Sequence, residues 1–189
     1  MAPTPHIGAA TPPTARITRG KTARNRLRGS DHFLLHHDPG LRLRRDGAWA
    51  DALCVDLGYG AEPHTTLEWA RRLHRHAPRL QVLGVEIDPE RVSRARPFTD
   101  ARTTFREGGF DLPLRPHERV RLVRAFNVLR QYDEHEVAPI WSQLAGQLLP
   151  GGLLVDGTSC PYGRTWNACL VRRPVDLVDD AWHLEALVL

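Results

Sequence analysis

A regular alternation of strand-like and helix-like segments from residue 52 onward is the feature that most constrains the fold. Short apolar runs are each followed by a glycine, proline or capping signal and then by a helical pattern. The expected strands cover residues 52–57, 80–87, 103–107, 119–127 and 153–156. Strands that alternate with helices form βαβ units, whose strands run parallel in one sheet. The sequence therefore predicts an α/β protein with a mostly parallel central sheet and helices on both of its faces.

Capping signals predict where three helices begin. Residues 65–68 (TTLE) match the capping box, and Asp133 with Glu136 forms a second one. Residues 88–89 supply an aspartate N-cap followed by proline at the first helical position. The helix that begins after Asp133 is expected to stop at residues 150–152 (PGG). Its apolar residues share one helical face, at Val137, Ile140, Trp141, Leu144 and Leu148.

The N-terminal part of the chain differs from the rest in composition and charge. Residues 1–15 are rich in proline, threonine and alanine, so we expect a disordered tail. Residues 16–50 form a basic segment, in which Ser30 and Asp31 are expected to cap a helix. The first 50 residues hold nine Arg and Lys against three Asp, whereas residues 51–189, the expected domain, hold 17 basic against 19 acidic residues. The net charge of +4 therefore lies in the N-terminal segment, which could meet an anionic partner.

Composition argues against several classes of protein. No apolar run approaches the ~20 residues of a membrane-spanning helix, and no apolar segment near the N-terminus marks a secretory signal. The three cysteines form no CxxC pair, which suits a reducing compartment, so we expect a cytoplasmic protein. Cys54 is expected to be an inert core residue, and Cys160 follows the expected strand at residues 153–156. The ten histidines have no carboxylate or cysteine partners at zinc-like spacing, so we expect no metal.

Residues that could bind a ligand follow the ends of the expected strands, where open α/β sheets hold their ligands. Residues 56–60 (DLGYG) follow the first strand, and Gly58 and Gly60 would let the backbone turn sharply beside a ligand. Glu86 ends the second strand, where a carboxylate can accept hydrogen bonds from both hydroxyls of a ribose. Together these features predict a ligand that contains a nucleoside.

Two common nucleotide sites do not match the pattern. The dinucleotide fingerprint GxGxxG would need glycine where Pro63 stands, which disfavours a nicotinamide-dependent oxidoreductase. The sequence also lacks the GxxxxGK[ST] loop that binds the phosphates of ATP.

Five motifs, in order and at sensible spacing, resemble those of class I S-adenosylmethionine-dependent methyltransferases. They are VDLGYGAEP at 55–63, GVEIDPERV at 84–92, GGFDLP at 108–113, FNVLRQYDEHE at 126–136 and LLPGGLLVDGT at 148–158. With NRLRG at 25–29, the set also resembles a bacterial group of such proteins whose substrate is uncharacterised, over about residues 16–158. The resemblance implies a Rossmann-like fold and S-adenosyl-L-methionine as the cofactor.

The resemblance also implies roles for individual residues. The methionine portion of the cofactor would be lined by Asp56, Gly58 and Gly60, and Tyr59 would also bind the cofactor. Glu86 would bind the ribose and Ile87 would pack on the adenine face, with Phe110 and Asp111 at the adenine edge. Asn127 would lie near the transferable methyl group and the substrate. No residue is assigned a catalytic role; Tyr132, Asp133 and His135 are candidates for a general base, although a helix cap and a surface position explain the last two.

Two departures from the family pattern matter. Glu62 replaces the usual third glycine of the first motif, so its side chain must point away from the cofactor or pair with a positive group on it. Only 31 residues follow Thr158, which predicts an abbreviated C-terminus in which residues 165–172 and 181–189 supply two short strands.

These observations predict a methyltransferase whose acceptor, a small molecule or a macromolecule, is unidentified. The alternative is a non-catalytic, methyltransferase-like module that binds RNA or a protein, with the basic stretch from Arg16 to Arg28 neutralising phosphates. We expect no membrane association. If the terminal edge of the sheet is incomplete, a homodimer that covers it is expected.

Overall fold

The computed structural model describes residues 14–176 and 182–189, so almost all of the tail expected at residues 1–15 lies outside the described part. Seven strands form one sheet. Their bounds are β1 Leu53–Leu57, β2 Val82–Glu86, β3 Thr103–Glu107, β4 Val120–Phe126, β5 Leu148–Ser159, β6 Trp166–Arg172 and β7 His183–Val188. The α-helices are α1 Arg28–His37, α2 Gly40–Leu43, α3 His64–His76, α4 Pro89–Ala95 and α5 Glu134–Gly146, and short 3₁₀ turns include Leu129–Gln131.

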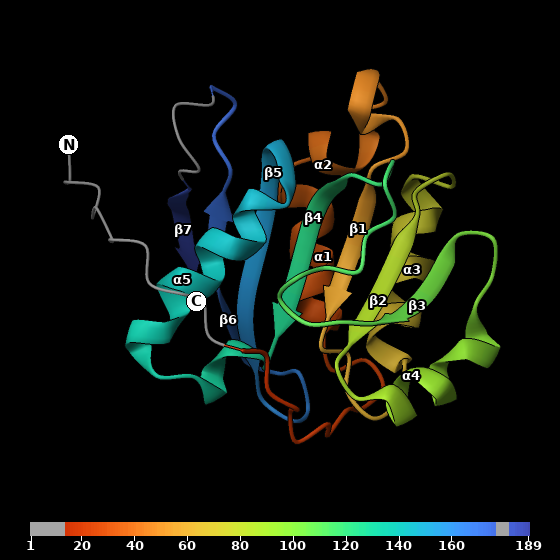
Figure 1. The fold of residues 1–189 in the computed structure, drawn as a ribbon, viewed down its shortest axis with the longest axis vertical. Coiled ribbons are helices and arrows are strands. Elements are labelled where there is room, and N and C mark those ends of the chain that lie inside the picture. The colour runs from red at the N-terminus through yellow and green to blue at the C-terminus, as the bar shows by residue number, and fades with distance from the viewer. Residues whose placement is uncertain (1–13, 177–181) are drawn as a thin grey trace.

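The strand order is β3-β2-β1-β4-β5-β6-β7, and β1 to β5 are parallel (Figure 1). From β1 the chain winds outward to β3 and then returns to place β4 on the other side of β1. The carboxyl ends of β1 and β4 therefore flank the point where the winding direction reverses, which is where such sheets bind ligands. The mostly parallel, Rossmann-like sheet predicted from the sequence is confirmed.

Apolar side chains cover both faces of the sheet. On one face, Leu34 and Leu35 of α1 and Trp69 and Leu73 of α3 pack over the sheet. On the other face, α5 is joined by residues 108–119, which connect β3 to β4 without a helix. The basic segment thus contributes α1 to the core, since burying these side chains removes their apolar surface from water.

The sheet ends in two antiparallel pairings. Residues 160–165 lead directly from β5 into β6, which pairs antiparallel with β5, and β7 pairs antiparallel with β6. The two short strands expected near the C-terminus are therefore present. β7 lies at the edge of the sheet (Figure 1), but the homodimer that would cover it stays a prediction.

Two of the predicted helix starts are confirmed and two are wrong. Asp88 accepts hydrogen bonds from the amides of Glu90 and Arg91 at the start of α4, and a capping box at Asp133 starts α5. Residues 65–66, however, lie inside α3, because their hydroxyls donate to the Asp56 carboxylate instead of capping the helix. Residues 30–31 likewise lie inside α1 and form no cap.

The boundary between α5 and β5 also differs from the prediction. The helix ends at Gly146, and β5 begins at Leu148 rather than Leu153. Leu148 pairs with Val120, but Leu153 already pairs with Leu122, so β5 carries extra residues in a bulge. Proline and glycine at 150–152 are accommodated there, with Gly151 at a φ of +81°.

None of the helices in the two described ranges has the length and apolar character that crossing a bilayer requires.

Candidate functional site

A tight bend follows β1 at the carboxyl edge of the sheet. Gly58 and Gly60 have φ angles of +71° and +88°, which side chains rarely tolerate. A Cβ atom on Gly58 would also lie 2.6 Å from Cγ2 of Val128. Any other residue at position 58 would therefore be strained and would displace Val128.

Glu86, at the end of the neighbouring strand β2, faces this bend. Its Oε2 accepts a hydrogen bond of 2.9 Å from the backbone amide of Gly60, and its Oε1 accepts one of 3.1 Å from Ile87. Glu86 is 1% exposed, and Nη1 of Arg91 lies 3.5 Å from Oε1. The carboxylate and the glycine bend, which the sequence predicted to meet, are thus in contact.

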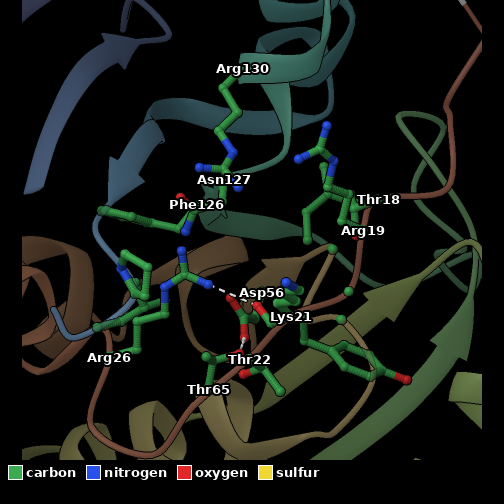
Figure 2. Close-up of a pocket in the computed structure, with 17 residues that line it drawn as sticks. Thr18, Arg19, Lys21, Thr22, Arg26, Asp56, Thr65, Phe126, Asn127 and Arg130 are labelled. Carbon is green, nitrogen blue, oxygen red and sulfur yellow. Dashed lines mark hydrogen bonds between the residues drawn. The ribbon is translucent and has the colours of Figure 1, made fainter.

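Two cavities flank the bend. The larger, of about 180 Å³, is bordered by Asp56, Gly58, Tyr59, Gly60 and Asn127 among the predicted site residues (Figure 2). The smaller, of about 20 Å³, is bordered by Gly58, Glu86, Ile87 and Phe110. The side chains of Asp111 and Glu62 are exposed and border neither cavity, so the glutamate that replaces the third glycine does not intrude.

The segment Thr14–Thr22 lies across the bend, which the sequence did not predict. The carbonyl of Gly20 accepts a hydrogen bond of 2.9 Å from the amide of Ala61. The carbonyl of Thr18 accepts another, also 2.9 Å long, from Arg91. In Figure 1 this segment runs past the carboxyl ends of the central strands. We call residues 14–22 the strap.

The strap also closes the smaller cavity. The backbone amide of Arg16 donates to the Tyr132 hydroxyl over 2.6 Å, and the Arg16 guanidinium pairs with Glu136 at 2.5 Å. Ala15 packs so closely on Gly109 that a Cβ on this glycine would lie 2.6 Å from that of Ala15. Ile87 and Phe110, two of the residues predicted to hold adenine, therefore lie under the strap, whereas Asp111 does not.

A buried ion network lies beneath the larger cavity. Arg124 donates to Asp56 over 2.9 Å and also pairs with Asp31 of α1. Thr65 and Thr66 occupy the second oxygen of Asp56, at 3.1 and 2.7 Å. Asp56 borders the cavity as predicted, but both of its carboxylate oxygens already have partners within the protein.

Sequence reasoning missed this network, although β4 contained a signal for it. Arg121 and Arg124 interrupt an otherwise apolar strand, and both are fully buried. Arg121 donates to the backbone carbonyls of Ala52 and Leu41, so it ties α2 to the sheet. A charge in a central strand must be paired or hydrogen-bonded, and that requirement could have predicted buried acceptors for both arginines.

Asn127 follows β4 and has a φ of +63°. Its side-chain nitrogen donates to the Ser159 hydroxyl over 3.1 Å, and its oxygen accepts from the Ser159 amide over 3.1 Å. Both contacts fix the amide at the edge of the larger cavity, where the resemblance places the substrate.

The candidate bases have structural roles. Tyr132 is 8% exposed and packs on Phe110 with ring centroids 5.4 Å apart, and burial raises its pKa. Asp133 caps α5, and His135 is exposed in the first turn of that helix. Tyr59 also has a structural role, because its ring packs edge-to-face on Phe105 with ring centroids 5.4 Å apart.

The described cysteines differ in their environment. Burial raises the pKa of Cys54 to about 12, in keeping with the predicted inert core. Cys160 is partly exposed, and its Sγ accepts hydrogen bonds from the amides of Thr165 and Arg164 at 3.5 and 3.2 Å. These bonds lower the pKa of Cys160 to about 6. Within the described residues, no group of three His, Cys, Asp or Glu side chains could hold a metal ion.

No protein-family model matches the sequence, and no curated protein matches it either. Solved structures do. Magnesium protoporphyrin IX methyltransferase of Synechocystis PCC 6803, with bound S-adenosylmethionine, is 18% identical over 69% of this chain and 56% of its own, with a TM-score of 0.49. The N-methyltransferase NodS of Bradyrhizobium japonicum WM9 is 20% identical over 70% of this chain and 67% of its own, with a TM-score of 0.44.

A third match is an S-adenosylmethionine-dependent methyltransferase of Mesorhizobium loti, 25% identical over 64% of this chain and 52% of its own, with a TM-score of 0.41. The chain thus spans between 52% and 67% of the length of these three proteins. These structural neighbours belong to the family that the five sequence motifs resemble.

Proposed function

We propose that this protein is an S-adenosylmethionine-dependent methyltransferase that acts on an unidentified acceptor. The observation that carries the proposal is the contact between the Glu86 carboxylate and the amide of Gly60. It joins a buried acid to a glycine bend at the point where the winding of the sheet reverses.

The residues present are chemically suited to this cofactor. Glu86 offers oxygens to the ribose hydroxyls, Ile87 and Phe110 offer apolar surface to adenine, and Gly58 and Gly60 leave backbone room for the methionine portion. The strap now leaves about 20 Å³ beside Glu86, far below the ~300 Å³ of a typical small-molecule pocket. Cofactor entry therefore requires the strap to move outward, and its return would exclude water.

The bound cofactor would supply a methyl group already activated by a sulfonium centre. The protein then needs mainly to hold the acceptor in line with the methyl group and to exclude water from the site. Asn127 borders the cavity where an acceptor would lie, and the strap forms one of its walls. No general base is assigned, since the need for one depends on the acceptor.

Calorimetric titration with S-adenosylhomocysteine tests the proposal. We expect micromolar affinity for the wild-type protein, and a 10- to 100-fold loss in Glu86→Ala, because a hydrogen bond to a charged group contributes about 1.5–3 kcal/mol. Glu86→Gln keeps the shape and one acceptor oxygen, so it should lose less. Glu90→Gln, whose glutamate is exposed on α4, is the matched control and should bind like the wild type.

Wild-type protein that shows no heat of binding at millimolar ligand would refute the proposal. A folded Glu86→Ala variant, with an intact thermal unfolding transition and wild-type affinity, would refute the role of Glu86. Transfer of label from the cofactor to one fraction of a cell extract would then identify the acceptor.

A further inference from the structure

Four cationic side chains border the larger cavity. Arg19, Lys21 and Arg26 come from the N-terminal segment, and Arg130 comes from the turn after β4 (Figure 2). Within residues 14–176 and 182–189, none of the four has a carboxylate within 4.0 Å. In the same ranges, Asp56 is the one carboxylate that borders the cavity, and Arg124 already neutralises it. The cavity is therefore strongly positive.

Arg26 is the most constrained of these cations. It is 8% exposed, and it donates to the carbonyls of Lys21, Ser159 and Cys160 at 2.7, 3.0 and 3.2 Å. Carbonyl groups orient a guanidinium but do not cancel its charge. Each terminal nitrogen of Arg26 keeps one hydrogen without a described partner, which leaves two of its five donors for a ligand.

Arg130 faces the same cavity with the same sign of charge. Both side chains border this cavity, and burial and then the charge of Arg130 lower the pKa of Arg26. Arg26 is buried whereas Arg130 is exposed, and an anion between them would pair with the buried charge and offset the repulsion between the two arginines. Planar guanidinium groups bind carboxylate and phosphate oxygens in pairs, which adds geometric selectivity.

The proposed cofactor does not balance these charges. S-adenosylmethionine carries a sulfonium, an ammonium and one carboxylate, so its net charge is positive. A cavity with four cations disfavours it unless the second reactant brings negative charge.

We propose that the part of the larger cavity between Arg130 and Arg26, beside Asn127 and beyond the glycine bend that would hold the methionine portion of the cofactor, is the acceptor subsite. The acceptor would be a small molecule whose phosphate or carboxylate group binds there. The inference rests on the proposed methyltransferase function and adds the class of substrate. Arg130 would touch the anion from the exposed side, while Arg26 would be fixed in place by its three carbonyl partners.

Titration with sodium phosphate and with sodium acetate tests this inference, on the protein alone and on the protein saturated with S-adenosylhomocysteine. We expect millimolar binding of at least one anion to both forms, weakening as ionic strength rises. Arg130→Gln should weaken it about 10-fold and Arg130→Glu should abolish it. Arg71→Gln, in an exposed arginine of α3 away from the cavity, should leave it unchanged. Tighter phosphate than acetate would indicate a phosphate-bearing acceptor, and the reverse a carboxylate.

Several results would overturn the inference. One is no anion binding at about 100 mM, well above the range expected for a charged pocket. Another is competition between phosphate and S-adenosylhomocysteine, because the cations would then hold the cofactor's own carboxylate. Equal losses of anion affinity in Arg130→Gln and Arg71→Gln would show that the binding depends only on the overall positive charge of the protein. If phosphate binds as expected but S-adenosylhomocysteine does not, the proposed function fails and the acceptor assignment fails with it, while the anion site remains.

Discussion

Asp156 offers a quantitative test of how this fold holds a half-buried carboxyl group. It lies in β5, opposite Cys169 of β6, and its Oδ2 accepts one hydrogen bond of 3.1 Å from Nε1 of Trp141. No cation pairs with it in the described ranges, and the thiol of Cys169 faces the same region. Burial raises the pKa of Asp156 from its ordinary value of 3.8 to about 6, against the smaller opposing effect of the Trp141 hydrogen bond.

The sign of the effect on stability follows from the direction of this shift. Well below the ordinary pKa of 3.8, the carboxyl is protonated in both the folded and the unfolded chain and contributes no pH dependence. As the pH rises to about 6, the unfolded chain ionises first and the folded state loses stability. Above that range the full penalty is present, and because each tenfold change in proton affinity corresponds to about 1.4 kcal/mol, it amounts to about 3 kcal/mol.

Asp156→Asn removes this titration and keeps an oxygen for Trp141. The added amide hydrogens need a partner, which shifts the stability of the variant by a constant of about 1 kcal/mol. The free energy of unfolding, measured by urea denaturation of both proteins, should therefore differ by about 2.5 kcal/mol more at about pH 8 than at about pH 4, in favour of the variant. Asp51→Asn, at an exposed aspartate, is the control for general charge effects. A difference between wild type and Asp156→Asn that is constant across this pH range would refute the reasoning.

Two further predictions concern the buried network and the partly exposed thiol. Asp31→Ala leaves Arg124 with one carboxylate partner fewer in a fully buried site, so urea denaturation should show a loss of about 3–5 kcal/mol, and an unchanged midpoint would contradict this. Cys160 should react with iodoacetamide at a rate that is half-maximal near pH 6, as measured by mass spectrometry. Cys54 should stay unmodified in the folded protein. A half-maximal rate of Cys160 near pH 9 would show that the amide hydrogen bonds to its sulfur are not maintained in solution.

The sequence by itself determined the sheet and the position of the bend. Apolar runs of strand length have few alternatives once glycine, proline and capping residues bound them, so β3 was predicted to the residue, and β1, β2 and β4 to within two residues at either end. Gly58 and Gly60 were predictable because a positive φ beside a crowded neighbour excludes other residues. Glu86 followed from its place at the end of β2.

Only the tertiary structure decided which polar groups meet. Thr65 and Thr66 have the pattern of a helix cap, but the buried Asp56 offers their hydroxyls an acceptor that local sequence does not reveal. The path of the strap has no periodic signal, because its carbonyls accept hydrogen bonds from the amide of Ala61 and the guanidinium of Arg91, which lie far along the chain. Local patterns fix secondary structure because they act over a few residues. The charge of a cavity is the sum of side chains from distant segments, such as Arg26 and Arg130, and exists only once the chain has folded.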